Sequence, residues 1–553
     1  MDVDARGAAP PLPAHLGDFT TTRRVIPIAA IAVGIGAMCA VVALVLLRLI
    51  AFFTNVFYFG QFTLVPHSPA DHQLGAWAIL VPVAGALIIG AMARYGSERI
   101  RGHGIPEAIE AILIKGSRVE PKVAFLKPLS AAISIGSGGP FGAEGPIIMT
   151  GGAFGSLIAQ RFHLTSAERK TLLVAGAAAG MSATFAAPVA AALLAVELLL
   201  FEWKPRSFIP VALASATAAA VRPFLLGAGP LFPTSAATPG THATSLLACV
   251  LVGLFAGGLS AALTAAVYAA EDAFQHVPLH WMWWPALGGL AIGLGGRIEP
   301  RALGVGYDVI ANLLAGSLVG RALLVLLIVK ALIWSISLGS GTSGGVLAPL
   351  LIMGAALGGL LAPMLPHESV SFWPLVAMGA ILGGTMRSPF TGVVFALELT
   401  HDVNMMLPLL IAVSVAHAVT VLALRRSILT EKVSRRGFHL SREYATDPLE
   451  ILFVREVMAT DNSSSASVTH DVVAHPDEPL TLVVNRMAST GHTELCVVDR
   501  RDPTKVLGWI SLRHLLEARV RHLEEERRRE GALRLSAIVP RWLGASAEHP
   551  VVR

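Results

Sequence analysis

Glu144 is the only carboxylate in the glycine-rich apolar stretch GSGGPFGAEGPIIMTGGAFG at residues 136–155. An ionisable side chain in such surroundings is costly, and it therefore indicates a functional site. Pro146, two positions later, suits the first turn of a helix, and the free N–H groups of a helix start attract anions. We predict an anion site here, at which the carboxylate of Glu144 competes with the anion.

The second half of the chain repeats this stretch at an offset of 203 residues, as GSGTSGGVLAPLLIMGAALG at 339–358. A second pair of segments, PVAAALLAVEL at 188–198 and PFTGVVFALEL at 389–399, also matches. One matching glycine would mean little, but two separate runs of matches indicate an internal duplication.

The two copies differ in their charges. Leu347 takes the place of Glu144 in the second copy, so the carboxylate is a specific addition to a duplicated backbone. Glu197 and Glu398, by contrast, stand at corresponding positions of the two copies. We expect both to be structural, with their carboxylates satisfied by helix N-termini or hydroxyl groups.

Composition places these residues in a membrane protein. The 553 residues are 54% hydrophobic and 14% charged, with a mean hydropathy of +0.65, which excludes an ordinary soluble globule. Apolar runs that approach or exceed the ~20 residues needed to cross a bilayer lie at 25–47, 75–93, 244–270 and 323–338. The net charge of +5 is modest and spread along the chain, so we expect no nucleic-acid partner.

Other apolar segments are too short to cross and are interrupted by glycine or proline. They lie at 102–116, 122–135, 144–160, 168–181, 186–203 and 345–362. Short, interrupted helices are tolerated in lipid only where they line a buried site or a watery path, and paired ones in two halves indicate a binding site. We predict an all-α polytopic membrane domain over 22–440, with repeats at about 22–225 and 244–440.

Three of these segments begin with similar loops: GHGIP at 102–106, GAEGP at 142–146 and GVLAP at 345–349. In each, glycine precedes a proline that starts a helix. Helix dipoles that converge on one place supply the diffuse partial charge that a conducting anion path needs. Close helix packing would explain one such loop. Three of them, in a duplicated framework with one buried carboxylate, favour an anion path.

These loops resemble the GSGIP, G(K/R)EGP and GxFxP motifs of the CLC chloride channel/transporter family, in the same order and over about 22–440. The resemblance implies a homodimer with a separate chloride path in each subunit, and inverted repeats of short tilted helices within each subunit. It also implies that Glu144 is the external gate. By motif position, the residues at the chloride site are His103, Gly104 and Ile105, together with Val346 and Leu347, which would donate their backbone N–H groups to the anion.

The chain departs from the family pattern at four positions, the first of which is Ala143, where lysine or arginine precedes the gate. His103 replaces the serine of GSGIP, and Leu429 stands where a tyrosine supplies the second hydroxyl donor. Leu198 occupies the position of the inner glutamate that passes protons in the exchangers. Leu429 has no donor, so the inner end of the path is either an apolar constriction or wider than usual.

Two residues have open roles. His103 either donates an N–H to the anion, binding it more strongly when protonated, or is a neutral histidine that caps the following helix. Glu202 follows Leu198 at helical spacing, so it would lie on the same face as a substitute proton relay. The alternative that we favour for Glu202 is a charge cluster with Lys204 and Arg206.

From residue 441 the composition becomes more charged, and 441–553 is predicted to be a cytoplasmic tail. Its pattern predicts a strand, a helix, two short strands and a helix within 471–520, and it resembles a CBS module over about 453–520. Such modules usually work in pairs, and only one full repeat is present. Their nucleotide often binds a Ser/Thr-x-x-Asp pair; here Ser511 is followed by His514, which argues against a nucleotide.

The basic residues predict the orientation in the membrane. Arg23 and Arg24 precede the first apolar run, and a cluster of basic residues from Arg425 to Arg436 follows the last. By the positive-inside rule both termini are cytoplasmic, in a multi-pass protein of the cell (inner) membrane that contacts lipid. Residues 1–21 are rich in Pro and Ala and are expected to be mobile.

An enzymatic interpretation finds little support. GSGG at 136–139 resembles the serine loop of intramembrane proteases, for which His103 could serve as the base, but the second copy repeats GSG, which indicates packing. We therefore expect no enzymatic activity, no catalytic residues, no cofactor and no bound metal.

The predicted function is chloride transport gated by Glu144. Because the inner proton donor is missing, our first prediction is passive, channel-like or weakly coupled chloride movement. The alternative is proton/chloride antiport that uses His103 or Glu202 as the inner relay, and a carrier for another solute is the alternative of another class. Acid pH should raise the flux, since protonation removes the competing carboxylate from the anion path.

Overall fold

The computed structural model describes residues 21–113, 116–234, 242–437, 449, 452–460, 472–502 and 504–520. The segment predicted to be mobile, 1–21, lies outside the described residues except for its last position. The chain divides into two compact units, Met1–Ser441 and Arg442–Arg553, each of which is described by itself.

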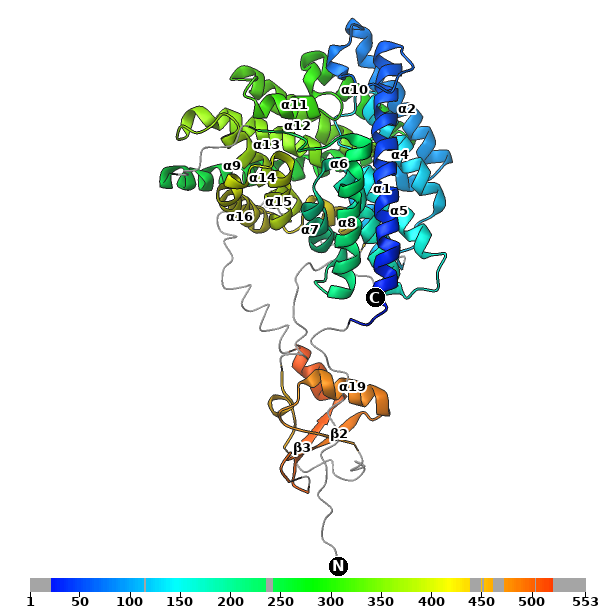
Figure 1. The fold of residues 1–553 in the computed structure, drawn as a ribbon, viewed down its shortest axis with the longest axis vertical. Helices are drawn as coiled ribbons and strands as arrows, with labels where there is room; N and C mark the ends of the chain where they lie inside the picture. The colour runs from blue at the N-terminus through cyan, green and yellow to red at the C-terminus, as the bar shows by residue number, and fades with distance from the viewer. Residues whose placement is uncertain are drawn as a thin grey trace, which may run out of the picture. The chain divides into compact units, whose positions relative to one another are not determined.

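The first unit is helical throughout, and its helices form two series (Figure 1). The first series is α1 (Val25–Thr54), α2 (Leu80–Tyr95), α3 (Ile105–Leu113), α4 (Pro121–Gly136), α5 (Glu144–Ala159), α6 (Ser166–Phe185), α7 (Pro188–Leu194) and α8 (Pro205–Leu226). The second is α9 (Ala243–Gln275), α10 (Trp284–Ile298), α11 (Tyr307–Leu314), α12 (Arg321–Gly339), α13 (Leu347–Leu361), α14 (Phe372–Met386), α15 (Pro389–Thr400) and α16 (Met406–Ala423), followed by α17 (Ile428–Arg435).

The two series correspond helix by helix. The helices α4 and α12 end 203 residues apart, at Gly136 and Gly339, and α5 and α13 begin at the same offset, at Glu144 and Leu347. Packing repeats as well: α1 lies against α8 and α5 against α6, as α9 lies against α16 and α13 against α14. The predicted duplication is thus confirmed as a structural repeat.

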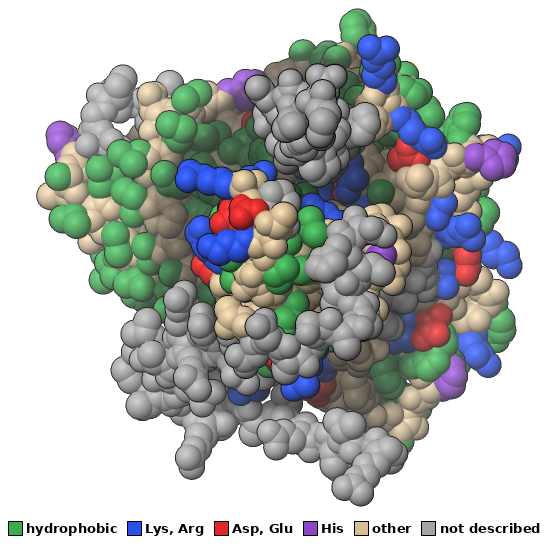
Figure 2. All heavy atoms as spheres, turned by 90° about the horizontal axis from the view of Figure 1, so that it is seen from below, with side chains coloured by type: hydrophobic (Ala, Val, Ile, Leu, Met, Phe, Trp, Pro, Cys, Tyr) green, Lys and Arg blue, Asp and Glu red, His purple; other side chains and the backbone are tan. Residues whose placement is uncertain are grey.

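Seven of the described helices or helical runs are long and apolar enough to cross a membrane, and three shorter apolar ones accompany them. Many of their outward side chains are hydrophobic, such as Phe224, Leu407 and Leu422, as expected of surfaces that contact lipid. Figure 2 shows hydrophobic side chains along the edges of the visible face, beside clusters of charged ones. The first unit is therefore a multi-pass membrane domain.

The second unit has a small α/β fold. Strands β1 (Val473–Ala474), β2 (Glu494–Val498) and β3 (Val506–Ser511) form a sheet in the order β1-β2-β3, with β1 parallel and β3 antiparallel to β2. Helix α19 (Leu480–Thr490) connects β1 to β2, and residues 512–520 form a further helix. The predicted order of strand, helix, two strands and helix is confirmed.

Candidate anion-binding site

The three loops that were predicted to converge meet in the middle of the membrane domain. Gly142 and Gly345, at equivalent positions of the two repeats, pair as a two-residue bridge, with N–H···O distances of 3.1 and 2.8 Å. The third loop joins them, because Gly102 bridges to Ser343 and its carbonyl accepts from Gly344 N–H at 3.4 Å. The loops therefore bring the starts of α3, α5 and α13 together.

The carboxylate of Glu144 lies across this junction. Its Oε1 accepts a hydrogen bond of 2.6 Å from the backbone N–H of Ala348, in the first turn of α13. The side chain is fully buried, and Oε2 has no hydrogen-bond partner among the described residues. A Cβ at Gly345 would overlap this carboxylate, so glycine is required for the close approach. Glu144 thus occupies a helix start that favours negative charge.

Val346 and Leu347, the predicted backbone donors, lie at the same helix start, as the N-cap and first residue of α13. We call Val346–Ala348 the α13 cradle. The first N–H groups of a helix have no partner within the helix, and here the carboxylate of Glu144 takes one of them. An anion in the cradle would need the same donors, so carboxylate and anion exclude each other. The sequence did not indicate Ala348.

His103 lies at the start of α3 and is buried, and its Nδ1 has no hydrogen-bond partner among the described residues. The cap of α3 comes from Glu107 instead, whose Oε2 accepts from Gly104 N–H at 2.9 Å. The capping interpretation of His103 is not supported, because its buried Nδ1 accepts no N–H group from the described residues. The N–H of Gly104 is therefore already bonded to Glu107. Ile105 is the first residue of α3, as predicted.

Two buried lysines that sequence reasoning missed hold the loops in place. Lys127 Nζ donates to the carbonyls of Ile100 and Gly102, at 2.8 and 2.7 Å. Lys330 Nζ donates to the carbonyls of Ala302 and Gly304, at 2.8 and 3.2 Å. The two lysines are 203 residues apart and fix the loops before α3 and α11 in the same way. The repeat offset was the signal that would have found them.

Apolar side chains occupy the two positions at which the family resemblance implies a glutamate and a tyrosine. Leu198 and Leu429 are both fully buried in the hydrophobic core of the membrane domain. A packed Leu429 favours the apolar constriction over an unusually wide opening. Next to it, the carbonyl of Ile428 accepts a hydrogen bond from the hydroxyl of Tyr268, so that this tyrosine is already engaged with backbone.

Glu202 does not share a helical face with Leu198, and this prediction is wrong. The π-helical turn Ala195–Leu200 ends two residues earlier, and Phe201 has a left-handed backbone with φ of 54°. Glu202 accepts a 2.6 Å hydrogen bond from Ser207 Oγ and lies within 3.8 and 3.9 Å of Lys204 and Arg206. The predicted charge cluster is confirmed.

Glu197 and Glu398 are structural, as predicted, and they are reciprocal. Glu197 accepts from the N–H groups of Phe390 and Thr391, at 3.2 and 3.0 Å, at the start of α15. Glu398 on α15 accepts from Val189 and Ala190, at 2.9 and 2.8 Å, at the start of α7. Each repeat thereby caps a helix of the other.

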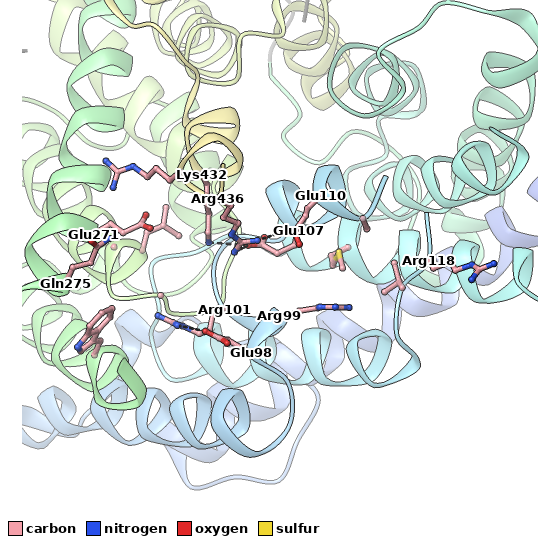
Figure 3. A pocket seen from close by; sticks show the side chains of 18 residues that line it. Glu98, Arg99, Arg101, Glu107, Glu110, Arg118, Glu271, Gln275, Lys432 and Arg436 are labelled. Atoms are coloured by element: carbon pink, nitrogen blue, oxygen red, sulfur yellow. Dashed lines mark hydrogen bonds and ion pairs between the residues drawn. The ribbon is translucent and has the colours of Figure 1, made fainter. Parts of the chain in front are cut away.

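A charged pocket of about 510 Å³ opens beside α3 (Figure 3). Six basic and four acidic side chains line it. Lys432 and Arg436, at the end of α17, point toward Glu107, with N···O distances of 3.2 and 3.5 Å. Because the same carboxylate accepts from Gly104, this ion cluster connects the pocket to the loop that carries His103.

The remaining candidate positions have local roles. The hydroxyl of Ser137, in the protease-like GSGG, donates to the carbonyl of Ser134 at 3.1 Å. In the second unit, Ser511 and His514 bond to each other at a helix start, through Ser511 N–H to Nδ1 at 3.3 Å and His514 N–H to Oγ at 3.4 Å.

The membrane domain is a helical repeat whose two halves meet at the α13 cradle, and one buried carboxylate lies there. This combination is typical of a class of membrane transport proteins. The model of the voltage gated chloride channel family matches residues 84–421, and the chain belongs to this family. A CBS domain model matches residues 454–521. The predicted family, fold and CBS region are confirmed.

Named relatives include the H(+)/Cl(−) exchange transporter ClcA of Salmonella paratyphi A and that of Salmonella newport. Each is 30% identical over 362 residues, which cover 62% of this chain and 75% of the relative.

Similar solved structures include a slow cyanobacterial Cl−/H+ antiporter (TM-score 0.66, 20% identity, 75% of this chain and 99% of that one). A CLC-type fluoride/proton antiporter has a TM-score of 0.61 at 18% identity, covering 72% and 97% of the two chains. A eukaryotic CLC transporter has a TM-score of 0.62 at 17% identity, covering 88% and 98%. At these identities the likeness concerns the fold.

Proposed function

We propose that this protein exchanges chloride for protons across the membrane, with Glu144 alternating with chloride at the α13 cradle. The observation that carries the proposal is the 2.6 Å hydrogen bond from Ala348 N–H to the Glu144 carboxylate. When Glu144 is protonated, its attraction to the positive helix start falls, and chloride replaces it. The same side chain thus binds a proton and admits an anion, and exchange requires in addition that protons reach it from the other side of the membrane.

The names of the relatives favour exchange over the channel-like movement that was our first prediction. Both Salmonella proteins are H(+)/Cl(−) exchange transporters. Of the two inner relays considered, Glu202 is tied into a cluster with Ser207, Lys204 and Arg206. His103 remains, with a buried unpartnered Nδ1 beside the ion cluster of the charged pocket. We assign the inner relay to His103.

Passive chloride movement is the second candidate. Leu198 and Leu429 are packed apolar side chains at the positions where a proton donor and a hydroxyl were expected. If the path through His103 carried no protons, Glu144 would exchange protons with one side alone and act as a simple gate.

The proposal includes a homodimer with a separate path in each subunit, in the cell (inner) membrane, with both termini in the cytoplasm. The family resemblance supports the dimer, and the basic residues around the first and last helices support the orientation. No covalent chemistry is part of this function, and no nucleotide at the CBS region is required.

Reversal potentials of the full-length protein in a planar bilayer test the proposal. With equal chloride on both sides and a tenfold proton gradient, exchange predicts a reversal potential displaced from zero, whereas passive chloride movement predicts zero. A current that follows chloride alone would establish the second candidate. Proteoliposomes that release no chloride would contradict both and favour a carrier for another solute.

A further inference from the structure

Two of the buried polar atoms without hydrogen-bond partners in the described part of the chain belong to side chains that interact electrostatically with each other. They are Oε2 of Glu144 and the hydroxyl of Tyr307, the first residue of α11. Buried polar groups are almost always paired, and each exception calls for an explanation. One explanation accounts for both atoms if they bind each other in a second position of the Glu144 side chain.

The geometry of α13 links the two groups. Glu144 is bonded at Ala348, and Ile352 lies one helical turn further along α13. The start of α11 packs at that turn, since a Cβ on Gly306 would touch the side chain of Ile352. Tyr307 follows directly, and the Glu144 carboxylate is close enough to interact with it electrostatically.

Tyr307 itself is held in place. Its ring lies edge-to-face with that of Phe185 and tilted against that of Phe232, with centroids 6.1 Å apart in both pairs. The loop before α11 is anchored by Lys330, which bonds the carbonyls of Ala302 and Gly304. The hydroxyl is thus presented by a rigid frame, and the carboxyl group is the partner that can move.

We propose that the Tyr307 hydroxyl is the hydrogen-bond donor that receives the Glu144 side chain when chloride displaces it from the α13 cradle. The proposal rests on the proposed function. Tyr307 is then a positioning residue: Ala348 N–H holds the side chain in the cradle, and Tyr307 O–H holds it outside. The repeat relates α11 to α3, which begin 202 residues apart.

The charged groups around the pair set the direction of the effect. Lys330 on α12 interacts electrostatically with both Glu144 and Asp308, and Asp308 accepts a 3.0 Å hydrogen bond from Ser68. A neutral carboxyl group, whose carbonyl accepts from Tyr307, is the form best suited to leave the cradle. Stabilising the displaced form therefore lets the gate open at a higher pH.

The test is Tyr307→Phe in the full-length protein, which keeps the ring contacts and removes only the hydroxyl. Chloride efflux from proteoliposomes is measured between pH 4.5 and 8. Loss of one hydrogen bond should disfavour the displaced position about fivefold, which moves the pH of half-maximal flux about 0.7 units toward acid. An unchanged pH profile would overturn the proposal.

Two controls separate this role from a structural one. Tyr58→Phe removes another buried hydroxyl, one that donates to the carbonyl of Ser137 at 3.1 Å, and should leave the pH profile unchanged. In a Glu144→Ala background, Tyr307→Phe should have no further effect on flux, because the side chain that it binds is gone. An equal effect with and without Glu144 would overturn the proposal. Wild-type protein without any chloride flux would overturn the proposed function itself.

Discussion

Glu144 and Leu347 begin equivalent helices of the two repeats, and both helix starts lie at the Gly142–Gly345 bridge. Both side chains are fully buried. In the first repeat, however, the residue reaches across to the helix start of the other repeat, whereas Leu347 has no polar group with which to return the contact. The two repeats therefore share a backbone arrangement at this junction, and only the first carries a carboxylate that bonds the helix start of the other.

The buried lysines show the same division between shared structure and separate function. Lys127 and Lys330 anchor the loops before α3 and α11 with the same two-carbonyl contact. Their charged neighbours differ: Glu107 and Lys432 surround Lys127, while Asp308 and Glu144 surround Lys330. Of the two lysines, Lys330 is therefore the one that interacts electrostatically with the Glu144 carboxylate.

Glu144→Leu makes the two repeats alike at their helix starts and should have the largest effect. With no carboxylate to occupy the α13 cradle, chloride flux in proteoliposomes should become independent of pH between 4.5 and 8. Proton movement driven by a chloride gradient should fall at least about tenfold, since one proton-binding step is lost. Leu347→Met, an apolar exchange of similar volume, is the matched control and should change neither. Acid activation that survives Glu144→Leu would show that another group senses pH.

Lys330→Met should separate the two lysines by their effect on pH dependence. Removal of a cation near the Glu144 carboxylate makes its ionised form less favourable, so the gate should open at a pH about one unit higher. Lys127→Met removes the equivalent anchor of the first repeat, which interacts electrostatically with Glu107 and Lys432, and should destabilise the protein without the upward pH shift expected of Lys330→Met. Flux–pH curves and thermal unfolding in detergent measure the two effects. Equal pH shifts in both variants would mean that loop anchoring, and not charge, acts on the gate.

The sequence predicts the helix starts of the site but not the contacts between them. The 203-residue offset predicts where α5 and α13 begin, because helix starts depend on local glycine and proline signals. It does not predict that Glu144 bonds Ala348, 204 residues away, because that contact depends on how the repeats dock.

The errors have local causes. Glu202 does not lie on the predicted helical face because the helix ends at Phe201, which has a left-handed backbone. The leucine-rich sequence before it does not predict this helix end. His103 has a buried Nδ1 without a described partner, and the side-chain hydrogen bond at the start of α3 comes from Glu107 instead. Both misses come from treating a helix boundary as a matter of periodicity, when side-chain hydrogen bonds and single backbone conformations decide it.

The smallest effects are expected where the repeats remain alike. Glu197→Ala and Glu398→Ala each remove a carboxylate that caps a helix of the other repeat, and each should cost about 1–2 kcal/mol of stability. The loss at Glu197 should be the larger, since its Oε2 also accepts a 2.6 Å hydrogen bond from Thr391 Oγ1. Thermal unfolding in detergent measures both, with Glu120→Ala, which removes a 2.9 Å surface ion pair with Arg99, as a control of near-zero effect. Because both carboxylates hold helices and neither lies in the α13 cradle, the pH dependence of chloride flux should stay that of the wild type. A shifted pH profile in either variant would mean that the symmetric glutamates also take part in gating.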